Sequence, residues 1–112
     1  MQFNRNITAT GTYSLGDAMP GSVARWVVTL TDEGSLGSIS IVPKGTATGS
    51  GETKTNAPYT TQVAPDTWID PGSTPITAVG TYIIEASGQE IDLVIGTLSA
   101  GTLGVKANGI RG

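Results

Sequence analysis

Alternation of apolar and polar side chains is the feature that most constrains this sequence. Apolar residues recur at every second position in ARWVVTL, residues 24–30, and in IDLVI, residues 91–95. This period of two is typical of a β-strand with one buried face. No window of ten residues repeats apolar side chains at the 3.6-residue period of a helix. Because Thr, Val and Ile also suit a pleated surface, the sequence predicts an all-β domain.

The strands can be placed from this alternation and from the turn residues between them. We expect strands at residues 3–13, 23–31, 36–43, 59–63, 80–86, 90–95 and 102–107. Two pairs are predicted to form hairpins, residues 23–31 with 36–43 and residues 80–86 with 90–95, and Asn108-Gly109 favours a further turn. About seven or eight short antiparallel strands indicate a small β-sandwich or a jelly-roll-like barrel. The pattern leaves a jelly roll and an immunoglobulin-like sandwich both open.

The length of 112 residues fits a single β domain spanning residues 1–112. Residues 44–57, KGTATGSGETKTNA, contain no large apolar side chain and are predicted to form an exposed flexible loop or hairpin tip. Residues 64–75 hold three prolines and are predicted to be irregular. Residues 1–8 and 107–112 are candidates for docking arms, because termini often become ordered only on docking.

The charge balance limits the classes of partner. Only 13% of residues are charged and the net charge is −3, with no run of Lys or Arg, so a nucleic-acid partner is not expected. No apolar run approaches the ~20 residues of a membrane helix, and a membrane partner is not expected either. Few charges also leave a surface that tolerates close contact with neighbouring molecules, which is a first indication of assembly.

Residues that could perform chemistry are scarce. The chain has no His and no Cys, which excludes Ser-His-Asp and Cys-His catalysis as well as the usual zinc sites. Asp66 and Asp70 could bind calcium or act as paired carboxylates, but their spacing does not match a calcium loop, and Asp is common in turns. Glu90 and Asp92 alternate as on any solvated strand face. We therefore expect no enzyme activity, no cofactor and no metal.

The two tryptophans have different surroundings in the sequence. Trp26 alternates with apolar neighbours and is predicted to lie in the core. Trp68 lies in the proline-rich stretch, where it could cover the end of the core, anchor a protein interface or stack on a sugar. The first of these three roles is the commonest for a lone aromatic side chain.

The C-terminal third of the chain resembles a family of proteins. The matching residues are Gly80-Thr81-Tyr82, the turn glycine Gly88, the alternating strand at residues 91–95 and SAGTLGV at residues 99–105. This pattern is similar to that of small β-rich virion structural proteins of tailed bacteriophages, which include capsid decoration or cement proteins, head fibres and tail components. The resemblance implies a structural role without enzyme activity, in repeated copies on a particle.

The leading hypothesis is a capsid decoration protein, made in the host bacterial cytoplasm and located in the virion. It would assemble as a symmetric homo-oligomer, with a trimer favoured, and bind the major capsid protein or another virion protein through uncharged Thr, Ser, Gly and Val faces. The predicted interface residues are Arg5, Arg25, Tyr59, Trp68 and Arg111, the arginines because a guanidinium pairs bidentately with carboxylates. The alternative is a carbohydrate- or receptor-binding module of a tail or fibre that uses Trp68, Tyr59 and residues 45–54.

Overall fold

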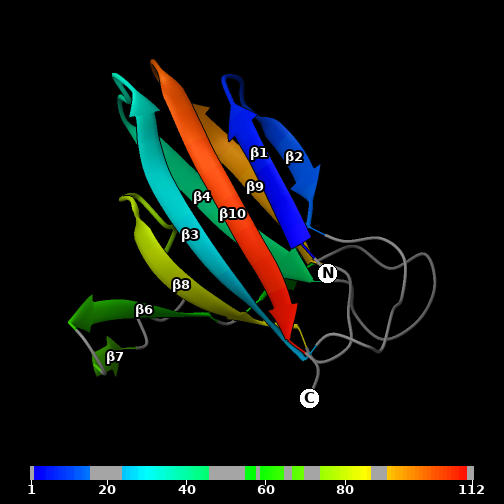
Figure 1. Cartoon of the computed structure of the whole chain (residues 1–112). Coiled ribbons are helices and arrows are strands. Elements are labelled where there is room, and N and C mark those ends of the chain that lie inside the picture. Colours follow the sequence, from blue (N-terminus) through cyan, green and yellow to red (C-terminus); the bar gives the residue numbers. More distant parts are fainter. Residues whose placement is uncertain are drawn as a thin grey trace.

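The computed structural model consists of two antiparallel β-sheets packed against each other (Figure 1). It describes residues 2–15, 24–45, 55–57, 59–64, 67–69, 74–86 and 91–110. The strands within these residues are β1 Gln2–Ile7, β2 Gly11–Ser14, β3 Arg25–Gly34, β4 Ile39–Gly45, β5 Thr55–Asn56, β6 Tyr59–Ala64, β7 Thr67–Ile69, β8 Gly80–Glu85, β9 Ile91–Leu98 and β10 Thr102–Ile110. No helix in this part of the chain has the length and apolar character needed to cross a bilayer.

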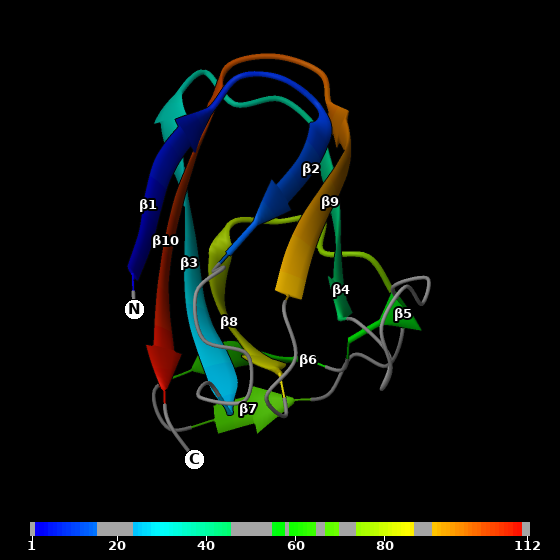
Figure 2. The ribbon, with the colours of Figure 1, turned by 90° about the vertical axis from the view of Figure 1, so that its right-hand side faces the viewer.

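The strand order identifies the sandwich as a jelly roll. Sheet A has the order β1-β10-β3-β8-β6-β7 and sheet B has the order β2-β9-β4-β5. The chain passes from one sheet to the other between β1 and β2, β3 and β4, and β9 and β10, and these connections close one end of the sandwich (Figure 2). The predicted fold class, a small all-β sandwich or jelly-roll-like barrel, is confirmed, and the immunoglobulin-like alternative is excluded. β6 and β7 extend sheet A beyond the eight-stranded unit.

Both predicted hairpins are wrong. β3 and β4 lie in different sheets, and so do β8 and β9. The single strand expected at residues 3–13 is likewise two strands, because the chain crosses from sheet A to sheet B at residues 8–10. Alternation along a strand indicates which side chains face the core. The alternation is the same whether the next strand pairs with it in the same sheet or lies across the core in the other sheet. The sequence pattern therefore located the strands but not their partners.

The core lies between the two sheets, where the predicted inward faces meet. Trp26, Val28 and Leu30 of β3 are buried, as predicted. Ile91, Leu93 and Ile95 of β9 are buried opposite them. On β4 the inward residues are Ile39 and Ile41, whereas Val42 is only half-buried, which resolves the alternative that the sequence left open.

The expected docking arms are largely integral strands. β1 pairs with β10 over its whole length, and Ile7 and Ala107 are both in the core. β10 continues through the predicted Asn108-Gly109 turn, because Gly109 pairs with Trp26 of β3 and the backbone there belongs to the sheet. Met1 and residues 111–112 lie outside the described residues.

Two other predicted loops contain short strands. β5 pairs with Lys44 and Gly45 of β4, so the ends of the glycine-rich stretch form the expected hairpin, and its residues 46–54 lie outside the described residues. The proline-rich stretch contains β7, which pairs with β6. β6 itself confirms the strand expected at residues 59–63.

One five-residue pattern occurs twice, at residues 9–13 (ATGTY) and 78–82 (AVGTY). In each copy the glycine begins a strand, β2 or β8, with a φ of +154° at Gly11 and +148° at Gly80. In each copy the tyrosine hydroxyl donates a hydrogen bond to the alanine carbonyl four residues upstream, at 2.7 Å for Tyr13 and 2.6 Å for Tyr82. This geometry is a tyrosine corner. We call residues 9–13 the first corner and residues 78–82 the second corner.

The two corners occupy equivalent places in the jelly roll. The eight strands of the jelly roll fall into two halves, β1 to β4 and β5 with β8 to β10. Replacing each strand by the strand at the same place in the other half turns the sheet A order β1-β10-β3-β8 into β5-β4-β9-β2, which is the sheet B order read in reverse. Under this exchange β2 and β8 are counterparts, and both begin with a tyrosine corner. The repeated pattern therefore follows an approximate twofold symmetry of the strand order.

Candidate interaction surface

The outer face of sheet A has a small uncharged centre on β3 and β8, bordered by Lys106 of β10 opposite Thr29 and by the Arg25–Glu85 row. Val27 of β3 and Ile83 of β8 are cross-strand partners, and both are half-buried on the outer face. In the next row Thr29 pairs with Thr81. Because opposite residues of an antiparallel pair share one face, these side chains form one uncharged patch.

The outer face of sheet B has a similar composition. Val94 of β9 stands between Thr12 of β2 and Val42 of β4. In the following row Asp92 is opposite Lys44, which places two opposite charges side by side. Both faces are sparsely charged, as the low charge content of the sequence predicts for a surface that packs against other proteins.

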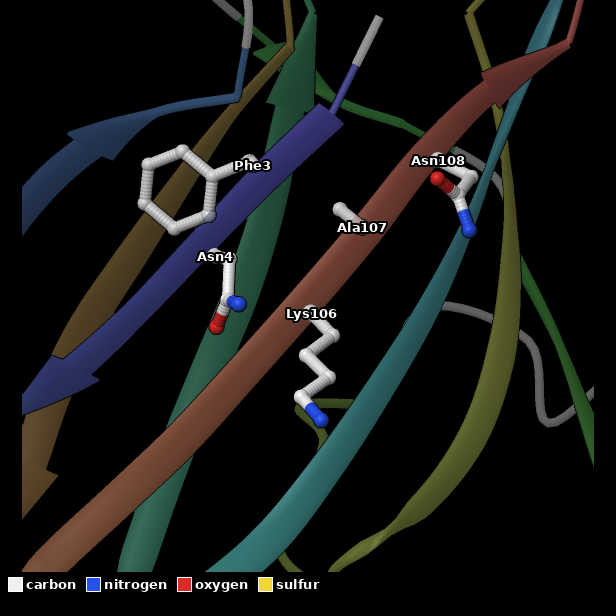
Figure 3. Close-up of a pocket in the computed structure, with 5 residues that line it drawn as sticks. All are labelled: Phe3, Asn4, Lys106, Ala107 and Asn108. Atoms are coloured by element: carbon white, nitrogen blue, oxygen red, sulfur yellow. The ribbon is translucent and has the colours of Figure 1, made fainter.

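A shallow depression of about 100 Å³ lies over β1 and β10 (Figure 3). Asn4 and Lys106 are cross-strand partners there, and Asn108 is on the same face of β10. Two amides and an ammonium can donate and accept hydrogen bonds, so this depression suits a polar contact.

Arg5, a predicted interface residue, makes a contact within its own chain. It extends from β1 so that its guanidinium carbon lies 5.3 Å from the centre of the Tyr13 ring on β2. β1 and β2 are neighbouring edges of the two sheets (Figure 2), so this cation–π pair covers the open side of the sandwich. An inward-pointing charge on an edge strand also discourages pairing with another chain.

The other predicted interface residues fall into three environments. Arg25 is exposed at the start of β3, in register with Glu85 of β8 and Ile110 of β10. Trp68 lies on the edge strand β7 with 38% of its surface exposed. Arg111 lies outside the described residues.

Tyr59 is a core residue and offers almost no surface to a partner. It is 5% exposed, its hydroxyl donates to the carbonyl of Thr74, and its ring packs edge-on against Tyr82 at 5.9 Å. Burial raises the pKa of the Tyr82 hydroxyl, a change that the hydrogen bond with Thr61 opposes and the neighbouring Tyr59 reinforces. The burial of Tyr59 was not predicted, although residues 59–63 read YTTQV and the period of two places Tyr59 and Val63 on the same side of the strand.

Two exposed apolar side chains were not singled out from the sequence, Val79 at 46% exposure and Ile110 at 42%. Val79 occupies the variable position of the second corner. Comparing the two AxGTY stretches would have identified it, because the first corner carries the polar residue Thr10 at that position.

Two acidic residues after the middle of β3, Asp32 and Glu33, accept hydrogen bonds from nearby residues. Asp32 Oδ1 accepts hydrogen bonds from the backbone nitrogens of Gly34 and Leu36, at 3.0 and 3.1 Å. Glu33 accepts one from the Thr31 hydroxyl. No group of three acidic side chains that could hold a metal occurs among the described residues, and Asp66, Asp70 and Glu90 lie outside them.

Comparison with known proteins gives a structural likeness only. No protein-family model matches the sequence, and no curated protein matches it. The crystal structure of the SPBc2 prophage-derived protein YomS is similar to this fold, with a TM-score of 0.59 and 18% sequence identity. The likeness covers 96% of this chain and 92% of that chain. At this level of identity, the two proteins share a fold over nearly their whole lengths.

Proposed function

We propose that this chain is a bacteriophage virion structural protein of the capsid decoration type, without enzyme activity. The observation that carries the proposal is the fold shared with a prophage-derived protein over nearly the full length of both chains. The pattern at residues 80–105, which resembles that of phage virion proteins, is consistent with the same origin. The jelly roll is an architecture that viral capsid domains use, although lectins and cupins use it too.

The surface supports a role in adhesion. The outer face of each sheet carries an uncharged patch, Val27 with Ile83 on sheet A and Val42 with Val94 on sheet B. Specific protein interfaces bury about 1,200–2,000 Å² in total, with an apolar centre and a polar rim. We propose that one such patch faces the major capsid protein, and that copies of the chain contact one another as a symmetric homo-oligomer, with a trimer favoured.

The proposal is tested on virions produced from the genome that encodes the chain. Gradient-purified particles are expected to contain the chain at a copy number comparable to that of the major capsid protein. Brief exposure to a mild denaturant is expected to release it while the shell stays intact. Absence of the chain from purified virions, or a copy number of only a few, contradicts the decoration role.

A carbohydrate- or receptor-binding module is the second candidate, and the exposure of Trp68 favours it. An indole ring on a strand edge can stack on a sugar. Glycan-array binding by the pure chain, abolished in Trp68→Ala, is the result that would establish this alternative. Binding that is unchanged in the variant would remove Trp68 from that role.

A further inference from the structure

The strand β2 is an edge of sheet B. Its only neighbour among the described strands is β9, and it lies at the rim of the sandwich (Figure 2). Leu15, which follows β2, donates its backbone N–H to the carbonyl of Ile91 of β9 at 2.9 Å. Because backbone groups alternate sides along an antiparallel pair, the N–H and C=O of Thr12 point away from β9. Thr12 therefore presents a main-chain donor and acceptor on the side of β2 that no described strand covers.

The two neighbouring sheet edges, β1 and β2, differ in how they are protected. Edge strands are commonly guarded against pairing by charged side chains, proline, bulges or short length. β1 carries Arg5, whereas β2 reads Gly-Thr-Tyr-Ser, without charge or proline. The four residues of β2 pair with four consecutive residues of β9, and only this short length limits the edge. A strand added on this side of the molecule is therefore expected at β2.

The other half of the jelly roll shows what covers the equivalent strand. β8 is the counterpart of β2, and the antiparallel strand β6 pairs with it. The register places Tyr59 opposite Ile84 and Thr61 opposite Tyr82. The Tyr59 ring packs edge-on against the Tyr82 ring at 5.9 Å, and Thr61 forms a hydrogen bond with the Tyr82 hydroxyl. The covering strand thus carries an aromatic residue two positions before a threonine.

The positions that receive these two side chains also exist on β2. The Gly-Thr-Tyr stretch that begins both strands aligns Tyr13 with Tyr82 and Leu15 with Ile84. Leu15 and Ile84 are both buried, whereas Tyr13 is only half-buried and Tyr82 is buried under β6. A strand that pairs with β2 as β6 pairs with β8 places an aromatic side chain opposite Leu15 and a threonine opposite Tyr13.

A second copy of the chain does not supply such a strand. An aromatic residue two positions before a threonine occurs once in the sequence, at Tyr59 and Thr61. Those two residues belong to β6 and already pair within sheet A. The strand that covers β2 must therefore come from a different protein.

We propose that an extended segment of a virion partner protein adds to sheet B along β2, antiparallel to it, with an aromatic side chain opposite Leu15 and a threonine opposite Tyr13. This inference rests on the proposed function, because it names how the chain binds the major capsid protein. In strand addition the main-chain hydrogen bonds supply affinity, and the alternate side chains supply specificity.

A synthetic peptide with the β6 sequence, PYTTQVA (residues 58–64), is the probe. In an NMR titration of the whole chain, millimolar peptide is expected to shift the amide signals of residues 11–15. Replacing the tyrosine of the peptide by alanine should weaken binding about fivefold or more, because the ring contact is lost. A scrambled peptide of the same composition is the control. Absence of shifts at residues 11–15, shifts confined to β8, or equal shifts with the scrambled peptide would each overturn the proposal.

Two substitutions at one position separate the backbone from the side chain. Thr12→Pro removes the outward N–H, which makes no bond to β9, so the fold is expected to survive as proline does on other sheet edges. Thr12→Ala keeps that N–H and is the matched control. Circular dichroism verifies that both variants are folded. Peptide binding should weaken at least about tenfold in Thr12→Pro and stay within about twofold of the wild type in Thr12→Ala.

The same two variants, carried by the phage genome, separate this inference from the proposed function. Purified virions are expected to contain at least about tenfold less Thr12→Pro chain than Thr12→Ala chain, and hydrogen exchange at residues 11–15 should slow on the virion. Equal incorporation of the two variants overturns strand addition and leaves the decoration role standing. Absence of the wild-type chain from virions removes the decoration role, and the peptide titration then decides by itself whether β2 accepts a strand.

Discussion

The two tyrosine corners share one local structure and differ in their surroundings. In the first corner Tyr13 is half-buried, its hydrogen bond to Ala9 is exposed, and Arg5 stacks over its ring. In the second corner Tyr82 is 6% exposed, its bond to Ala78 is partly buried, and Tyr59 packs edge-on against it with an interplanar angle of 68°. The same five-residue pattern is thus an edge feature in one half of the jelly roll and a core feature in the other.

The difference comes from the extension of sheet A. β2 is an edge strand of sheet B, whereas its counterpart β8 is covered by β6 and β7. β6 brings Tyr59 beside Tyr82 and converts the second corner into part of the core. The extension also carries Trp68, and the second corner presents Val79 where the first presents Thr10. One added pair of strands therefore separates a corner that covers the edge of the sandwich from a corner that is part of the core.

The largest expected difference between the corners follows removal of the whole tyrosine side chain. Tyr82→Ala leaves a cavity against Tyr59 and should lower the free energy of unfolding by about 3–5 kcal/mol, as for other buried aromatic residues. Tyr13→Ala should cost less than half as much, because its ring already contacts solvent. Urea unfolding of the two variants measures both costs. Equal costs would mean that burial does not distinguish the corners.

The glycines should behave alike, in contrast to the tyrosines. Gly11→Ala and Gly80→Ala should each cost about 1–3 kcal/mol, because φ near +150° is open to almost no residue but glycine. The added Cβ would meet only the tyrosine ring of its own corner, at 3.7–3.9 Å, so the cost lies in the backbone. Gly96→Ala is the matched control, since a Cβ there meets nothing within 4 Å, and it should change little. A cost at one corner only would contradict a shared local structure.

The local elements were predictable from the sequence, and the pairing of strands was not. Trp26, Val28 and Leu30 alternate clearly enough to define a buried face, and so do Ile91, Leu93 and Ile95. By contrast, residues 32–38 look like a hairpin turn although they carry the chain between sheets. Asp32 stabilises that connection by accepting hydrogen bonds from the backbone nitrogens of Gly34 and Leu36. An Asp in a tight hairpin turn forms the same kind of bond, so the sequence does not distinguish the two cases.

The candidate surface was predictable in character and only partly in position. Low charge and abundant Thr and Val predicted sparsely charged outer faces, which Val27 and Ile83 exemplify. Trp68 was singled out from the sequence, and it is partly exposed on the edge strand β7. The open depression between Leu36 and Val79 was not foreseen, because its walls come from segments some forty residues apart that only the three-dimensional arrangement brings together.

Removing only the hydroxyl groups isolates the corner hydrogen bonds. Tyr82→Phe should cost about 0.5–1.5 kcal/mol, the usual net value of a hydrogen bond that is at least partly buried. Tyr13→Phe should cost less, because water can replace the exposed bond to Ala9. Thermal or urea unfolding at pH 7 provides the comparison, and a larger loss at Tyr13 would reverse the assignment of the two corners.

The cation–π pair is expected to be specific to the first corner. A double-mutant cycle of Arg5→Ala and Tyr13→Leu should give a coupling of about 0.5–1 kcal/mol, typical of an exposed pair. The control cycle replaces Arg5 by Arg25, which lies in β3 and is separated from the edge strand β1 by β10, and it should be additive. Additivity in the Arg5 cycle as well would show that the stacked geometry contributes nothing to stability.

The smallest effect belongs to the second corner and appears only at alkaline pH. Because burial raises the pKa of Tyr82 above the ordinary value of 10.0, the folded chain holds this proton at a pH where the unfolded chain releases it. Unfolding then releases a proton, so stability is full below pH 10 and decreases as pH rises through the folded pKa. Urea unfolding between pH 8 and about 11 should show this decrease in the wild type, and Tyr82→Phe should remove part of it. An unchanged slope in Tyr82→Phe would mean that the buried hydroxyl is not the group that titrates, and the contrast between the corners would then rest on packing alone.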